Sequence, residues 1–360
     1  MNTKPKVLVT GSTGKTGGAV VRELLRLGWP VRALVRNHDA RGEELKRLGA
    51  EVVAADMYDP QQLLEAMRGT QRAYFVPPMR PYIIQAATAF AVAAHEAKLE
   101  AIVQMSQWTS NPVHPALMTR QTWLLDRTFA MIPGVGHIIV TPGVFADNVL
   151  RIMDFAALLG ILPVLTGTSK SAPVGNEDIA RVVAALLKNP TPYLGKRYRP
   201  TGPKLISAQE AAAIIQSVLG RRVRPFNLPT WMFLKVARMQ GVDPFQIYSL
   251  LDYLEDHKRG VFAFEGGVNN VVEELTGAPA ENFETTVRRY AAMPFTQRTF
   301  ANCLRAFVNC NLTPFYPGYN LKRYAGEHEF PQVPHPQLSA ESEFWRKEHT
   351  LNSSKPAMAL

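Results

Sequence analysis

The stretch "VTGSTGKTGGAVV", from Val9 to Val21, decides the fold, and it admits two interpretations. Its Gly14-Lys15-Thr16 end resembles the end of a P-loop, which cradles nucleoside triphosphates. A P-loop also needs a glycine five residues before Gly14, and this chain has Val9 there, inside an apolar run. The loop that a triphosphate requires therefore lacks its first half.

The second interpretation is a dinucleotide-binding turn between a strand and a helix. Gly11 would make the tight turn, Gly14 would let the backbone approach a pyrophosphate, and Gly17 would let the helix pack on the strand. Their G-x-x-G-x-x-G spacing differs from the G-x-G-x-x-G of simple dehydrogenases. Because a strand-like run precedes the glycines and an amphipathic segment follows them, we predict a dinucleotide site rather than a structural turn.

The first half of the chain alternates strand-like and helix-like segments. Short Gly/Pro turns separate them, a pattern that predicts βαβ units and an α/β fold: a doubly wound parallel Rossmann sheet. The expected strands are Val7–Thr10, Val31–Val35, Glu51–Ala55, Ala73–Val76, Ala101–Met105 and His137–Val140. The expected helices are Gly17–Leu27, Glu43–Leu48, Pro60–Met67, Tyr82–Ala97 and Arg120–Ala130.

This regularity fades after Gly143, which predicts a smaller, mostly helical C-terminal substrate domain. We expect helices at Asn148–Leu159, Asn176–Leu187, Ser207–Leu219 and Trp231–Asp256, the third opened by a capping box of Ser207 and Glu210. The predicted domains are a cofactor domain at 1–150 with returning segments at about 165–205, a mixed satellite domain at 151–330 and an extended tail at 331–360.

The end of the second strand indicates which dinucleotide is bound. An acidic residue there would favour NAD, but the segment "VRALVRN" has Arg36, which suits the 2′-phosphate of NADP. Lys15 can add a second cation. Asp56 ends the third strand and can face the adenine, and "FVPP" (Phe75–Pro78) ends the fourth strand beside the cofactor. The alternatives are that Arg36 is only a surface charge, and that Asp56 and the "FVPP" segment are ordinary residues at strand ends without a cofactor role.

Several segments together resemble the NmrA-like branch of the atypical, extended short-chain dehydrogenases/reductases. They are "VTGSTGKTG" (Val9–Gly17), "VRALVRN" (Val31–Asn37), "AADMYDPQQL" (Ala54–Leu63), "TPGVFADNVL" (Thr141–Leu150) and "GNEDIARVVAALLKNP" (Gly175–Pro190). The resemblance covers about residues 6–293 and implies a Rossmann domain with a small substrate domain. It implies either an NADPH-dependent quinone or phenylpropanoid ether reductase, or a cofactor-binding redox sensor without turnover. The implied cofactor residues are Gly11, Thr13, Gly14, Lys15, Thr16, Gly17, Arg36, Asp56, Met57, Val76, Pro77, Pro78, Ser106 and Gly143.

The catalytic residues depart from the usual pattern. Short-chain reductases generally use a Tyr-x-x-x-Lys pair, and no tyrosine of this chain has a lysine four residues later. The lysine that NmrA-like enzymes often keep would fall near Gln121 or Thr122, and Arg120 is the nearest cation. The remaining candidates are Ser106, placed by the resemblance near the nicotinamide, His114 as a proton donor, and Tyr82. The alternatives are that His114 is an exposed loop residue without a function and that Tyr82 only packs against neighbouring side chains.

A substrate site is expected beside these residues. Gln107 and Trp108 follow Ser106, and Phe145 and Asn148 resemble the family segment between cofactor and substrate domains, although Asn148 could simply cap a helix. The aromatic segments "FNLPTWMF" (Phe226–Phe233) and "NLTPFYPGYNLKRY" (Asn311–Tyr324) would either roof an apolar pocket or form a satellite core and a wrapping tail.

Composition limits the partners. The 360 residues carry a net charge of +10, but the cations are scattered, which favours a solvated surface over nucleic-acid binding. Cys303 and Cys310 are too far apart for a helical disulfide, and no His/Asp/Cys cluster predicts a metal. The longest apolar stretch, Phe155–Leu165, is too short to span a bilayer. We expect no membrane partner, a cytoplasmic location and, as an option, a homodimer.

These observations favour one function. The sequence predicts an NADPH-dependent reductase that transfers hydride to an apolar, aromatic or quinone-like small molecule without the Tyr-x-x-x-Lys pair. The missing pair supports an alternative, a non-catalytic NADP(H)-binding redox sensor that acts through a protein partner.

Overall fold

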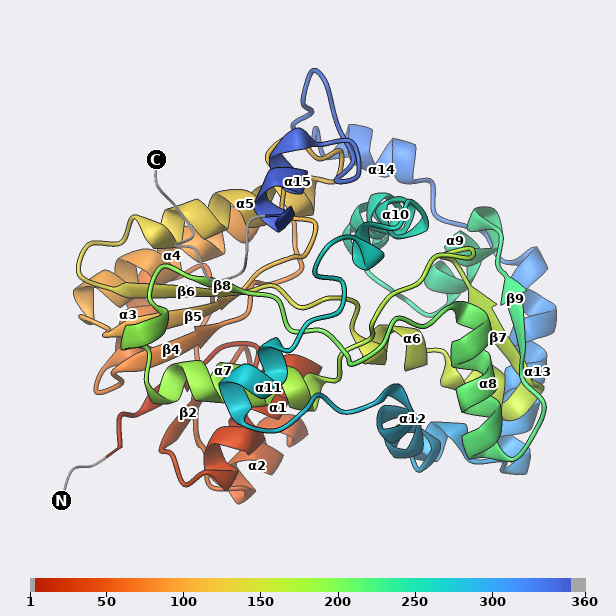
Figure 1. Ribbon diagram of the computed structural model, residues 1–360, viewed down its shortest axis with the longest axis horizontal. Helices are drawn as coiled ribbons and strands as arrows, with labels where there is room; N and C mark the ends of the chain where they lie inside the picture. The colour runs from red at the N-terminus through yellow and green to blue at the C-terminus, as the bar shows by residue number, and fades with distance from the viewer. Residues whose placement is uncertain (1–3, 351–360) are drawn as a thin grey trace.

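A parallel seven-stranded sheet forms the centre of the larger lobe. The computed structural model describes residues 4–350, so the last part of the expected tail lies outside the described residues. The strand order is β3-β2-β1-β4-β5-β6-β8, with every neighbouring pair parallel (Figure 1). The predicted doubly wound fold is confirmed. The strands are β1 (Val7–Val9), β2 (Val31–Val35), β3 (Glu51–Ala54), β4 (Arg72–Phe75), β5 (Ala101–Met105), β6 (Gly136–Val140) and the unexpected β8 (Arg197–Tyr198).

Alternate residues of the central strands pack into two separate cores. Val7 and Val9 point into one core, while Leu8 points into the other. The first core is covered by α1 (Lys15–Arg26), α2 (Ala40–Arg47), α7 (Asn176–Lys188) and α11 (Val271–Thr276). The second is covered by α3 (Pro60–Met67), α4 (Ile83–Glu96) and α5 (Leu117–Ala130). Figure 1 shows α4 and α5 above the sheet and α1, α2 and α7 below it.

The smaller lobe is built around a two-stranded parallel sheet, β7 (Ile161–Val164) and β9 (Arg224–Asn227). Its core includes residues of α6 (Ala146–Leu150), α8 (Ala208–Leu219) and α12 (Phe283–Ala291). The predicted capping box of Ser207 and Glu210 opens α8. The single helix expected at Asn148–Leu159 is wrong, because α6 ends at Leu150 and a separate π-helix spans Phe155–Leu159 before Gly160 turns left-handed at φ +73°.

The helix expected at Trp231–Asp256 is also divided, into α9 (Thr230–Met239) and α10 (Pro244–Lys258). Gly241 adopts a left-handed φ of +65°, and Pro244 cannot donate to a preceding turn, so the first helix stops and the second begins there. Asp243 caps α10 by accepting a hydrogen bond from the Phe245 backbone. α9 and α10 are therefore separate helices, and side chains of both line one cavity.

The C-terminal part forms α13 (Phe300–Leu312), α14 (Leu321–Glu327) and α15 (Glu343–Thr350). Helix α15 lies beside α5 (Figure 1), with Trp345 buried against Trp108. Cys303 and Cys310 are free thiols on α13. Short 3₁₀ turns occupy Thr191–Tyr193, Val261–Ala263, Pro294–Thr296 and Thr313–Phe315. Within residues 4–350, no helix has the length and apolar character needed to cross a membrane.

Candidate functional site: a dinucleotide turn and an adjoining cavity

The turn after β1 can be made only with its glycines. Gly11 adopts a left-handed φ of +60°, which favours glycine over other residues. A Cβ atom on Gly17 would lie 2.3 Å from the carbonyl oxygen of Gly11, so any side chain there would push α1 away from the loop. The Thr10 hydroxyl further fixes the turn, because it accepts a hydrogen bond from the Val76 backbone at 2.8 Å. The turn therefore holds the start of α1 against the carboxyl edge of the sheet.

The N-terminus of α1 is left open for an anion. Gly14 is its N-cap, no side chain caps the helix, and its first turn contains no acidic residue. The first backbone N–H groups and the positive end of the helix dipole therefore remain available to phosphate oxygens. Lys15 and Thr16 line the cavity that begins here, while Thr13 is half-buried in the turn outside it. This arrangement fits the pyrophosphate of a dinucleotide.

Arg36 and Asp56 lie at the ends of neighbouring strands, β2 and β3, where the adenosine half of a dinucleotide would extend. Arg36 is exposed and has no ion-pair or hydrogen-bond partner within residues 4–350. Asp56 is also exposed, and its Oδ1 accepts a hydrogen bond from the Tyr58 backbone at 2.9 Å. Met57, beside it, packs partly into the second core. An unpaired guanidinium at this edge is free to meet a phosphate.

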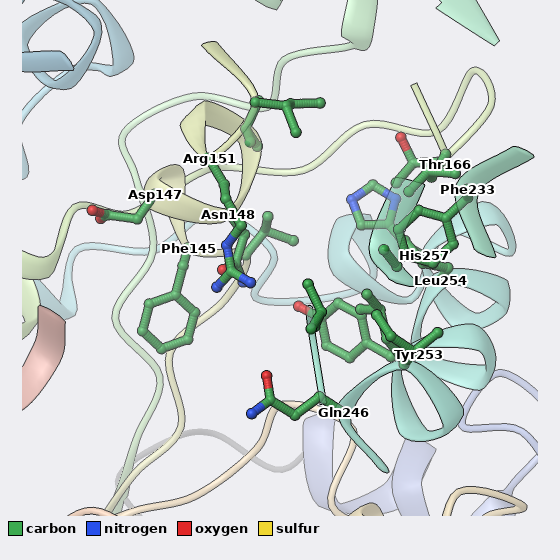
Figure 2. Close-up of a pocket in the computed structure, with 18 of the residues that line it drawn as sticks. Phe145, Asp147, Asn148, Arg151, Thr166, Phe233, Gln246, Tyr253, Leu254 and His257 are labelled. Atoms are coloured by element: carbon green, nitrogen blue, oxygen red, sulfur yellow. The ribbon is translucent and has the colours of Figure 1, made fainter. Parts of the chain in front are cut away.

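A cavity of about 840 Å³ extends from the start of α1 to α10. Its volume lies at the upper end of the usual range for small-molecule sites, and its walls are mainly apolar. Figure 2 shows Phe145, Asn148 and Arg151 on one side and Gln246, Tyr253 and His257 of α10 on the other. The predicted residues that line it are Lys15, Thr16, Val76, Pro77, Pro78, Ser106, Gln107, Trp108, Gly143, Phe145 and Asn148.

Ser106 is held by a buried polar network. Its hydroxyl donates to Asp126 Oδ2 at 3.0 Å, and the same carboxylate accepts from Ser110 and from Arg197 at 2.7 Å. Asp126 Oδ1 accepts from the Gln104 side chain at 2.6 Å. Because the Ser106 proton is committed to Asp126, its oxygen faces the cavity as a hydrogen-bond acceptor rather than as a proton donor.

Gln107 and Trp108 continue this wall in different ways. The Gln107 Oε1 accepts from Thr119 at 3.0 Å, and its Nε2 has no partner within the described chain, which leaves an amide donor at the cavity. The Trp108 indole donates to the Val261 carbonyl at 3.1 Å and packs on Phe262. Trp108 therefore forms a buried, apolar part of the cavity wall, and Gln107 contributes a polar group to that wall. Asn148 lies within α6 rather than capping it, with its side chain at the cavity.

Two sequence candidates do not reach the cavity. His114 is fully buried, its Nε2 lies 2.8 Å from Asp256 Oδ2, and its Nδ1 accepts from the Ala116 backbone at 3.0 Å. Both ring nitrogens are thus used inside the protein, so His114 joins a loop to α10 instead of facing a ligand. Tyr82 precedes α4 and is largely exposed, away from the cavity lining.

Lys15 was named in the sequence analysis, but the polar and charged groups around it near the α1 end were missed: Tyr290, Asp147 and Arg151. Lys15 Nζ donates to the Tyr290 hydroxyl at 2.5 Å, which donates to Asp147 Oδ1 at 2.5 Å. Burial lowers the pKa of Lys15, Asp147 opposes this effect, and the nearby Arg151 adds to it. Arg151 lines the cavity and has no ion-pair partner in the described part of the chain. Lys15 and Arg151 thus place two cations beside the open helix terminus.

Polar groups on α10 were also missed, because the segment is rich in apolar and aromatic residues. The Ser169 hydroxyl donates to the Thr166 carbonyl at 2.8 Å, so it must accept from His257 Nδ1, 2.7 Å away. His257 Nδ1 therefore carries the proton and Nε2 has a free lone pair. Burial lowers the pKa of His257 to about 4, which keeps the ring neutral near pH 7. Burial also raises the pKa of Tyr253, one turn earlier, so its hydroxyl stays protonated.

Comparison with known proteins identifies relatives of this chain. A model of the NmrA-like family matches residues 3–114. A (4-alkanoyl-5-oxo-2,5-dihydrofuran-3-yl)methyl phosphate reductase of Streptomyces griseus is 31% identical over 283 residues, covering 77% of this chain and 95% of the relative. An NAD(P)H azoreductase of Xenophilus azovorans is 28% identical over 292 residues, covering 79% and 98%. The solved Citrobacter sp. triphenylmethane reductase complexed with NADP(H) shares the fold, with a TM-score of 0.67 and 18% identity, over 79% of this chain and 99% of that one.

Proposed function

This chain belongs to the NmrA-like family, and on that premise we propose that it is an NADPH-dependent reductase of apolar, aromatic or quinone-like small molecules. One observation carries the proposal: the open N-terminus of α1 and the α10 side chains border the same cavity. A dinucleotide bound at the turn and an acceptor held against α10 would therefore share one enclosed space. The named activities of the two reductase relatives support the reaction class.

The cofactor half of the site would hold NADP(H). The Gly11–Gly17 turn and the start of α1 suit the pyrophosphate, and Arg36 suits the 2′-phosphate because a guanidinium matches phosphate geometry. Lys15 and Arg151 add positive charge close by. When bound, the nicotinamide supplies the hydride. Residues 1–150 with about 165–205 would form the cofactor domain, and 151–330 would form the substrate domain.

The acceptor half would be formed by groups that orient the ligand. The neutral Tyr253 hydroxyl can donate a hydrogen bond to an acceptor oxygen or nitrogen, and His257 Nε2 can accept one from a hydroxyl or amine. Phe145 and Trp108 supply aromatic walls, and Ser106 and Gln107 supply an acceptor and a donor. The reduced product would take its hydride from the cofactor and its proton from the Tyr253 hydroxyl, which would at once recover a proton from water because burial disfavours the tyrosinate. Tyr253 thus occupies the role left open by the missing Tyr-x-x-x-Lys pair.

A second function is favoured by one specific observation. The Ser106 proton is held by Asp126, and the chain lacks the Tyr-x-x-x-Lys pair, so the groups that usually protonate a carbonyl are missing from their usual place. A protein that binds NADP(H) without turnover and signals through a protein partner would have no need of them. We propose a cytoplasmic location for either function, and a homodimer is compatible with each.

Turnover separates the two functions. NADPH absorbance is followed with the purified protein and a panel of quinones, azo compounds, enones, imines and aldehydes. Oxidation with one acceptor class, abolished by Arg36→Glu and retained by the exposed control Arg47→Glu, would establish the reductase. Tight NADPH binding with no oxidation across the panel would contradict it and favour the sensor.

A further inference from the structure

One face of α13 is apolar and uncovered. Phe300, Phe307 and Phe315 are 84%, 61% and 86% exposed, and Leu304, Val308 and Leu312 on the same helix are also exposed. Positions 300, 304, 307, 308 and 312 recur at the three- and four-residue steps of one helix face, and Phe315 follows in the 3₁₀ extension. Ala306 is the only fully buried residue of α13. Isolated surface leucines are ordinary, but a continuous stripe of this size marks an interaction surface.

This stripe is continued by a neighbouring segment from elsewhere in the sequence. Lys235 of α9 donates to the Pro314 carbonyl, and Arg238 donates to the Gly318 carbonyl at 3.0 Å, so α9 lies against the end of α13. Trp231 on α9 and Phe226 on β9 are 54% and 47% exposed. Figure 1 shows α13, α9 and β9 at the end of the molecule opposite the seven-stranded sheet. We call the exposed side chains of 220–242 and 293–326 the aromatic face.

The two segments of the aromatic face are rich in basic residues, although Asp243 and Glu327 follow them directly and Glu327 pairs with Arg323. Residues 220–242 and 293–326 contain no Asp or Glu, and they contain nine Lys and Arg residues: Arg221, Arg222, Arg224, Lys235, Arg238, Arg298, Arg305, Lys322 and Arg323. The overall charge of +10 is therefore concentrated in part around the exposed aromatic groups. Exposed Phe, Trp and Tyr in segments that also carry several exposed Lys and Arg residues fit a partner that is apolar inside and anionic outside.

We propose that the aromatic face docks on an anionic phospholipid bilayer. Phe and Trp would enter the boundary between headgroups and acyl chains, while the Arg and Lys residues would contact lipid phosphates. A second copy of the chain fits less well, because a symmetric contact would oppose the same cations on both sides. The expectation of no membrane partner was based on the lack of a spanning stretch, and a helix lying on a surface needs none.

The wall of the cavity includes residues of this face. Phe226, Cys310, Thr313 and Pro314 belong to the two segments and also line the cavity. We therefore place the entrance for an apolar acceptor dissolved in the bilayer beside these residues, a consequence that rests on the proposed function. Docking itself requires neither cofactor nor turnover, so it is tested separately.

The test is flotation of the full-length protein with vesicles in a density gradient. Vesicles of phosphatidylcholine with about one third phosphatidylglycerol are expected to carry the protein, and added salt should weaken the binding. The triple variant Phe300→Ser, Phe307→Ser, Phe315→Ser should lower the bound fraction about 10-fold or more. Arg298→Glu with Arg305→Glu should lower it about 10-fold on the same vesicles. Both sets change exposed side chains, and an unaltered melting curve verifies folding.

The matched control is Leu124→Ser with Met131→Ser, which removes exposed apolar side chains at the opposite end and should leave flotation unchanged. Failure of the wild-type protein to float would overturn the proposal, as would flotation unaffected by the triple variant. If the protein does not float but forms a dimer that the triple variant converts to a monomer, the face is a self-interface and lipid docking is refuted. An active reductase that does not float refutes docking alone, and a floating protein without turnover refutes only the proposed reaction.

Discussion

The indole nitrogen of Trp345 donates a hydrogen bond to the backbone carbonyl of Trp108 at 2.9 Å, across 237 residues of sequence. Trp108 lies two residues after Ser106 and lines the cavity. The C-terminal helix α15 therefore supports the wall of the proposed acceptor site from behind, and Trp345 itself is almost fully buried.

Trp345→Ala should destabilise the protein and loosen that wall. Loss of a buried indole and the cavity left behind cost about 3–5 kcal/mol, and the unpaired Trp108 carbonyl adds to this. Urea unfolding measures the change, and the exposed neighbour Lys347→Ala serves as the control with little expected effect. A Trp345→Ala protein as stable as the wild type would show that α15 is not part of the folded unit.

Gly17→Ala should abolish dinucleotide binding. Its Cβ would lie 2.3 Å from the Gly11 carbonyl oxygen and 2.8 Å from the Thr10 carbonyl oxygen, so α1 must move away from the loop that receives the pyrophosphate. NADPH fluorescence titration gives the dissociation constant. Gly326→Ala is the matched control, because a Cβ there meets nothing within 4 Å. Unchanged NADPH affinity in Gly17→Ala would mean that the pyrophosphate binds elsewhere.

Arg36→Glu should weaken NADPH far more than NADH. The variant replaces a phosphate-binding cation with an anion, and only NADPH has the 2′-phosphate. We expect a loss of roughly 100-fold or more for NADPH, since a charged contact is worth about 1.5–3 kcal/mol and repulsion adds to it. Titration with both cofactors measures the ratio, beside the control Arg47→Glu. Equal losses for NADPH and NADH would remove the argument for NADP.

Tyr253→Phe should lower kcat by roughly 100-fold or more, because a positioned proton donor typically contributes about 10²- to 10⁴-fold, while NADPH affinity stays the same. Loss of packing alone is not expected, because the phenyl ring remains. Tyr82→Phe provides the comparison, since Tyr82 is exposed outside the cavity and its change should leave kcat unaltered. Steady-state kinetics with the acceptor found in the panel would settle the assignment, and the reverse ranking would restore Tyr82.

Stability should fall as the pH drops from about 6.5 to 4. Burial lowers the pKa of both His257 and His137 to about 4, whereas each would titrate near 6.5 in the unfolded chain. The unfolded state therefore binds more protons in this interval, and each histidine contributes at most about 3 kcal/mol that is present above pH 6.5 and lost on acidification. Urea unfolding across this pH range tests this, and His257→Gln should make the curve shallower. A curve unaffected by that substitution would show that His257 does not titrate between these limits.

The first half of the fold could be predicted because its signals are local. Alternation of apolar strands and amphipathic helices gives β2, α3 and β5 with their observed limits, and glycine spacing gives the dinucleotide turn. The half of the cavity that is proposed to bind the acceptor depends on contacts between residues far apart in the sequence. His114 looked like a loop proton donor, but Asp256, 142 residues later, holds it inside the protein.

The polar groups of α10 were hidden for a related reason. His257 and Tyr253 belong to a segment whose Phe, Tyr and Leu residues indicate a buried helix, and the break at Gly241 and Pro244 that precedes them was not foreseen from the sequence. Lys15 remains a predicted phosphate contact, and its hydrogen bond with Tyr290 spans 275 residues. No local pattern encodes a pairing at that distance.

The two halves of the cavity come from different parts of the chain. The proposed dinucleotide contacts are concentrated before residue 79, whereas α10, which faces them across the cavity, begins at Pro244. Substitutions in one half of the cavity can therefore accumulate with little effect on binding in the other half. This is expected where functional sites are built on a shared fold. A lineage with this architecture can exchange one acceptor for another by altering α10 while inheriting its electron donor unchanged.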